Sequence, residues 1–121
     1  MERTRFIEHR GERILLLDYS GTRDPQQAVA EIRRSMELIA QQPPRSLRVL
    51  TNVHDARYNA AVLQAMKELA AHNEPYVKAS AVIGMSGLHR VAYQAVIFFT
   101  RRKIQTFDDE QQALDWLVQQ E

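Results

Sequence analysis

The 121-residue sequence contains no cysteine. Disulfides, thiolate catalysis, zinc–thiolate sites and iron–sulfur clusters are therefore excluded. Glycine and proline are scarce, with four of each, so they mark turns and do not build linkers. No apolar run approaches the roughly 20 residues that a membrane-spanning helix needs, and the first residues lack the apolar stretch of a signal peptide. We therefore expect a cytoplasmic protein without a transmembrane segment.

Charge of one sign is also lacking, because 16 Lys and Arg residues face 15 Asp and Glu residues. A nucleic-acid-binding domain is usually far more basic, so we expect no nucleic-acid partner. Apolar residues make up 45% of the chain and charged residues 26%, the balance of a globular protein. The length suits one domain that spans residues 1–121.

The first third of the chain predicts a hairpin followed by a helix. Apolar stretches at residues 5–9 and 14–19 flank a turn at 10–13, so the two strands should pair. Asp24 followed by Pro25 is typical of a helix start. The helix should end before Pro43 and Pro44, since proline cannot continue it.

The rest of the chain repeats a strand and a helix three times. The strands are expected at residues 47–53, 77–83 and 103–107, and the helices after Asn59, at Leu88 and after Asp108 or Asp109. Trp116 should cover an edge of the core. This alternation predicts an α/β domain with a mixed sheet of about five strands and about four helices. Loops at the carboxyl ends of parallel strands usually carry the function; here they are residues 19–24, 52–59 and 84–88.

Three segments in this order resemble the STAS superfamily, which comprises sulphate-transporter and anti-sigma-factor-antagonist domains. They are residues 72–78 (His-Asn-Glu-Pro-Tyr-Val-Lys), residues 82–88 (Val-Ile-Gly-Met-Ser-Gly-Leu), and Phe-Asp-Asp-Glu at 107–110 with Ala-Leu-Asp-Trp-Leu at 113–117. The chain is most similar to short bacterial SpoIIAA-like proteins, whose fold is similar to that of CRAL-TRIO lipid-binding domains. The resemblance covers nearly the whole chain. It implies a single STAS/SpoIIAA-like domain without catalytic activity of its own.

The resemblance also implies a place for a phosphorylation switch. In anti-sigma antagonists, a partner kinase phosphorylates a serine at the start of a helix after a central strand. The matching stretch is residues 51–59, where Asp55 stands at the acidic position of the family. Ala-Arg-Tyr-Asn follows it with no serine, so we expect that the switch is absent.

The first functional hypothesis is therefore a regulatory or protein-binding module that needs no cofactor. Its binding surface should combine residues from the three carboxyl-end loops, namely Tyr19, Asn52, His54, Asp55, Arg57, Tyr58, Asn59, Ser86 and His89. The partner protein is left open.

Three alternatives use the same loops. His54, Asp55 and Ser86 have the residue types of a hydrolytic triad, although such residues also cap helices and form turns. A metal site would need His54 and His89 to converge with Asp55 or Asp18, and we expect none. The turn at residues 84–87 could hold an anion on its backbone N–H groups, or could be an ordinary helix start.

The helix expected at residues 88–100 is apolar on nearly all sides. Tyr93, Ile97 and Phe98 lie outside its core stripe. A helix of this kind is buried or pairs with something. It could be a covered core helix, a homodimer face, a membrane-surface contact or the wall of a pocket. The last alternative predicts a carrier or sensor of a small apolar, lipid-like ligand, as in CRAL-TRIO domains.

Overall fold

The computed structural model describes residues 3–57, 59–85 and 104–120. The chain forms β1 (Thr4–His9), β2 (Glu12–Asp18), α1 (Pro25–Ile39), β3 (Leu47–Asn52), α2 (Ala60–Asn73), β4 (Val77–Ile83), β5 (Ile104–Phe107) and α4 (Glu110–Val118). The strands make one five-stranded sheet in the order β1-β2-β3-β4-β5. β1 is antiparallel to β2, and the other neighbours are parallel. The predicted α/β class and mixed sheet are confirmed.

One of the expected helices lies outside the described residues. About four helices were expected, and the described part of the chain contains three. The helix expected at residues 88–100, with Tyr93, Ile97 and Phe98, lies outside the described residues.

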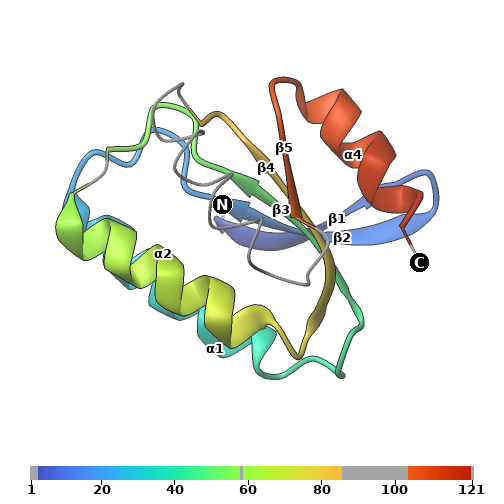
Figure 1. Cartoon of the computed structure of the whole chain (residues 1–121), viewed down its shortest axis with the longest axis horizontal. Coiled ribbons are helices and arrows are strands. Elements are labelled where there is room, and N and C mark those ends of the chain that lie inside the picture. Colours follow the sequence, from blue (N-terminus) through green and yellow to red (C-terminus); the bar gives the residue numbers. More distant parts are fainter. Residues whose placement is uncertain (1–2, 58, 86–103, 121) are drawn as a thin grey trace.

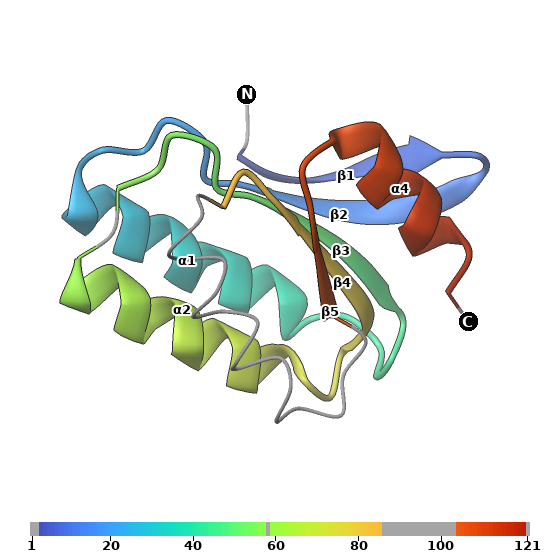
Figure 2. The ribbon, with the colours of Figure 1, turned by 45° about the horizontal axis from the view of Figure 1, so that its top comes forward.

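The three described helices cover both faces of the sheet. Figures 1 and 2 show α1 and α2 side by side on one face and α4 on the other. β2 shows why both faces are apolar: Leu15 and Leu17 belong to the core cluster under α1 and α2, whereas Ile14 and Leu16 belong to the cluster under α4. Successive side chains of a strand point to opposite faces. A strand buried on both faces therefore reads as a continuous apolar run.

The first hairpin turn is tighter than predicted. The turn was expected to span residues 10–13, but β2 already begins at Glu12, which pairs with His9. Only Arg10 and Gly11 form the turn, with φ angles of 52° and 80°. Positive φ at both central residues is the geometry of a two-residue hairpin turn whose twist matches the strands.

The predicted helix starts at Asp24 and Asp109 are confirmed. The side chain of Asp24 accepts a hydrogen bond from the Gln26 backbone N–H (3.0 Å), and Asp109 accepts one from Gln111 N–H (3.1 Å). Trp116 is half-buried, with its ring centroid 5.6 Å from that of Phe107. It covers an edge of the core as expected.

Two polar side chains, Arg48 and His9, fasten α4 to the strands. Arg48 donates to the carbonyl oxygens of Leu117 (3.1 Å) and Gln120 (2.8 Å), at the carboxyl end of the helix. Its side chain is only 13% exposed. On another side of α4, His9 Nε2 lies 2.8 Å from Asp115 Oδ1. The hairpin, the central strand β3 and α4 are thereby linked by polar contacts as well as by the core.

Candidate functional site

The carboxyl ends of the four parallel strands stand in line. Asp18 is paired with Asn52, Asn52 with Ile83, and Ile83 with Phe107. The segments that follow these residues therefore leave the sheet at the same edge. Figure 2 shows the segments after β2 and β3 running side by side above the first turns of α1 and α2.

The β3–α2 loop (residues 53–57) is held from two directions. On one side, Gly21 N–H donates to His54 O (2.8 Å), and Arg57 N–H donates to Thr22 O (3.0 Å). On the other side, Val53 N–H donates to Ile83 O (3.0 Å). Backbone hydrogen bonds to both neighbouring segments fix the position of this loop without using its side chains.

Gly84 brings the next loop very close to the β3–α2 loop. Its φ is +87°, and a Cβ at this position would lie 2.6 Å from His54 Cα and 2.8 Å from His54 Cβ. Real Cβ atoms essentially never approach other heavy atoms so closely. Only glycine lets the chain after β4 pass His54 in this conformation.

The β3–α2 loop presents its charged side chains to solvent. The side chains of His54 and Asp55 are 71% and 69% exposed, with Nε2 and Oδ2 3.7 Å apart. Asp55 has a left-handed backbone, with φ of 59°. Arg57 is exposed as well.

A hollow of about 480 Å³ lies beside this loop. Its described lining comes from the β3–α2 loop, from the two residues after β4 and from the residue after β5: Val53, His54, Asp55, Ala56, Gly84, Met85 and Asp108. The volume is in the range of small-ligand pockets. The lining combines an apolar part with charged side chains.

Two other predicted site residues, Asn52 and Asn59, use their side chains in local hydrogen bonds to the backbone. Asn52 uses its side-chain oxygen to accept from His54 N–H (3.0 Å), and Asn59 uses its own to accept from Val62 N–H (2.9 Å) at the start of α2. Both side chains thus stabilise the backbone on either side of the loop. Tyr58, Ser86 and His89 lie outside the described residues.

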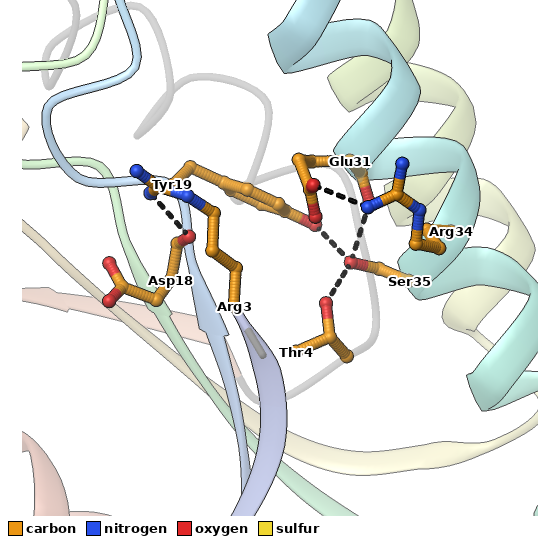
Figure 3. A network of polar contacts seen from close by, with 7 residues as sticks. All are labelled: Arg3, Thr4, Asp18, Tyr19, Glu31, Arg34 and Ser35. Carbon is orange, nitrogen blue, oxygen red and sulfur yellow. Dashed lines mark hydrogen bonds and ion pairs between the residues drawn. The ribbon is translucent and has the colours of Figure 1, made fainter. Parts of the chain in front are cut away.

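Tyr19 does not lie on the surface where the binding site was predicted. It is only 3% exposed, and its hydroxyl donates to Ser35 Oγ at 2.7 Å. Tyr19 therefore belongs to the core between β2 and α1. Figure 3 shows the polar network around it, which joins β1, β2 and α1.

This network was not predicted from the sequence. Ser35 is fully buried, and Glu31 is almost so. Glu31 Oε1 is 2.6 Å from the Arg34 guanidinium and forms an ion pair with it. One signal was available: Ser35 falls between Ile32 and Ile39 on the buried stripe of α1. A polar residue at a core position of a helix needs a buried partner.

The pKa of the Tyr19 hydroxyl lies well above its ordinary value. Burial is the main cause, because it disfavours the charged phenolate. The hydrogen bond with Ser35 lowers the pKa, and the negative charge of Glu31 raises it further. Tyr19 consequently remains a protonated hydrogen-bond donor at neutral pH.

Only some of the residues considered for the hydrolytic triad and for the metal site lie in the described part of the chain. His54 and Asp55 are neighbours, whereas Ser86 and His89 lie outside the described residues. The side chain of Asp18 accepts from Ser20 N–H at 3.0 Å. Among residues 3–57, 59–85 and 104–120, no group of three or more His, Asp or Glu side chains could hold a metal ion.

The sheet order, the helices on both faces and the loops at the carboxyl edge define a STAS-like α/β domain. The SpoIIAA-like family model matches residues 14–118, and the chain belongs to this family. A solved structure with a SpoIIAA-like fold is similar: an uncharacterized protein of the DUF3478 family from Shewanella loihica PV-4. It has 17% sequence identity and a TM-score of 0.75, and the match covers 94% of this chain and 91% of that one. No curated protein matches the chain.

A membrane-spanning helix was not expected from the sequence. In the part of the chain that the structure describes, none of the helices has both the length and the apolar character to cross a bilayer.

Proposed function

We propose that this protein is a cytoplasmic, non-enzymatic STAS-like module that binds a partner protein through the β3–α2 loop. The observation that carries the proposal is the combination of a fixed backbone and exposed charge. His54, Asp55 and Arg57 stand on a loop whose backbone is hydrogen-bonded to both neighbouring segments. A surface that is ordered before binding loses less conformational entropy when a partner docks.

The backbone of Asp55 supports a role for its side chain. Arg10, Arg45 and Asp55 all have left-handed backbones. This conformation is uncommon outside glycine and costs free energy, and it occurs at turns and at functional sites. Glycine would fit the backbone at this position better. Aspartate instead places a carboxylate 3.7 Å from the His54 ring, in solvent.

The exposure of His54 and Asp55 agrees better with a binding role than with catalysis. General bases work best where water is excluded and neighbouring groups tune them. The His54 and Asp55 side chains are instead about 70% exposed. Because residues 52–59 contain no serine, the proposal does not include the serine switch of the anti-sigma antagonists.

The test is a comparison of partner capture by four immobilised proteins: wild type, Arg57→Ala, Asp55→Gly and Lys67→Ala. Asp55→Gly removes the carboxylate and suits the left-handed backbone. Lys67 is an exposed cation on α2, away from the loop, and serves as the matched control. Retained proteins from an extract of the producing cells are quantified by mass spectrometry.

We expect that wild type and Lys67→Ala retain the same partner, and that Arg57→Ala retains roughly tenfold less, as for an interface residue worth about 1.4 kcal/mol. Circular dichroism of each variant checks that it is folded. If the four proteins retain the same set of partners in the same amounts, the β3–α2 loop is not the binding surface.

A further inference from the structure

Arg3, directly before β1, contacts the place where β2 passes into its following loop. Its Nη1 donates to the carbonyl oxygens of Asp18 (3.2 Å) and Ser20 (2.9 Å). In return, Asp18 N–H donates to Arg3 O (2.9 Å). Figure 3 shows Arg3 beside Asp18 and Tyr19. A guanidinium that donates to two carbonyls fixes their relative position, because its donors are rigidly spaced.

Thr4, the next residue, reaches the same end of β2 through α1. Ser35 Oγ donates to Glu31 O (3.0 Å), so its single hydrogen is used. Thr4 Oγ1, 2.9 Å away, and the Tyr19 hydroxyl, 2.7 Å away, therefore both donate to Ser35 Oγ. Tyr19 is also held by its backbone, since its N–H donates to Asn52 O (2.8 Å).

These contacts continue without a gap into the β3–α2 loop. Gly21 follows Ser20 directly, and its N–H donates to His54 O. Thr22 comes next, and its carbonyl oxygen accepts from Arg57 N–H. The backbone between Ser20 and Thr22 thus connects Arg3 to His54 and Arg57, two of the residues that we propose to contact the partner.

We propose that Arg3 is a positioning residue for the β3–α2 loop, so that the start of β1 helps to hold the binding surface in place. Within the described sheet, β1 is an edge strand and pairs only with β2, so its first residues can separate without breaking a central strand pair. Release of Arg3 removes its hydrogen bonds to the carbonyl oxygens of Asp18 and Ser20. The backbone after Ser20 is then held less firmly, and its two hydrogen bonds with His54 and Arg57 open more often. This inference rests on the proposed function for its biological meaning.

The test measures amide hydrogen exchange by NMR in wild type, Arg3→Ala, Arg3→Lys and Arg23→Ala. The amides of interest are those of Gly21 and Arg57, the donors of the two loop–loop hydrogen bonds. Arg23→Ala removes an exposed arginine from the same β2–α1 segment and controls for the loss of charge. The amide of Leu50, in a fully buried part of β3, reports global stability.

In Arg3→Ala, we expect that exchange at Gly21 and Arg57 becomes roughly tenfold faster, as for the loss of a hydrogen bond from a charged group. Exchange at Leu50 should change much less. Arg3→Lys should restore only part of the protection, since an ammonium donates hydrogen bonds but lacks the rigid spacing of the guanidinium donors, and Arg23→Ala should match wild type.

Two results would overturn the inference. Unchanged exchange at Gly21 and Arg57 would show that Arg3 does not position the loop. An equal acceleration at Leu50 would show that Arg3 acts only on global stability. The experiment needs no partner protein, so its outcome is independent of the capture experiment, which tests the proposed function.

Discussion

Gly84→Ala is the substitution that tests most directly how the site is built. The left-handed backbone, with φ of +87°, costs an L-amino acid roughly 1–2 kcal/mol. The added Cβ would also lie 2.6 Å from His54 Cα and press on the backbone of the β3–α2 loop. Overpacking of this kind typically costs about 1–3 kcal/mol, and no side-chain rotation relieves it because the contact is with backbone.

Gly11→Ala is the matched control for this prediction. Gly11 has nearly the same backbone, with φ of +80°, but no heavy atom lies within 4 Å of the position that a Cβ would take there. It should therefore cost only the conformational part, about 1–2 kcal/mol. Gly84→Ala should cost about 2–5 kcal/mol, the sum of the two contributions.

Thermal and urea denaturation of both variants measure this difference. At roughly 3–6 °C per kcal/mol for a domain of this size, the two melting temperatures should differ by several degrees. The NMR signals of His54 and Arg57 should shift in Gly84→Ala and stay unchanged in Gly11→Ala. Equal stability of the two variants would refute the close approach of Gly84 to the β3–α2 loop.

Three further predictions concern buried or paired polar groups. Because burial raises the pKa of Tyr19, the stability contributed by its protonated form is complete below the unfolded pKa of about 10 and is lost as pH rises through the folded pKa. Absorbance titration at alkaline pH should show one late-ionising tyrosine that is absent in Tyr19→Phe. A Tyr19 that ionises with the other tyrosines would contradict this prediction. The hydrogen bond from His9 is the main cause of the lowered pKa of Asp115. The stability from ionised Asp115 is therefore present above its unfolded pKa of about 3.9 and is lost as pH falls through the folded pKa. Carboxyl NMR should find a higher Asp115 pKa in His9→Ala, and an unchanged pKa would argue against the contact. Arg48→Ala should lower the free energy of unfolding, measured by urea denaturation, by about 1–3 kcal/mol, because two carbonyls at the end of α4 lose a cationic donor. A decrease below about 0.5 kcal/mol, as for an ordinary surface substitution, would show that water replaces the guanidinium.

Much of the site could be predicted from topology alone. Once the sequence indicates parallel strands joined by helices, their carboxyl ends must share one edge. His54, Asp55 and Arg57 were placed there correctly, on the loop after β3. The helix starts at Asp24 and Asp109 were also predictable, because a cap depends on a hydrogen bond to a residue only two positions away.

The errors arose where a residue's role depends on a distant partner. Tyr19 follows an apolar strand and begins a loop, a position that suits a surface residue or a core residue equally well. Its burial depends on Ser35, 16 positions away, whose hydroxyl accepts from the tyrosine. The turn at Arg10 and Gly11 was predicted too long, since the pairing of Glu12 with His9 is set by strand register.

Local periodicity and helix capping encode the alternation of strands and helices, the class of fold and the loops that meet at the carboxyl edge of the sheet, so the amino-acid sequence was enough to predict them. The packed structure was needed to learn which side chains of those loops face solvent. It was also needed to learn that Gly84 must pass against His54, and that Arg3 reaches the loop after β2. Burial and hydrogen bonding between segments depend on distances in space, which no local pattern in the chain specifies.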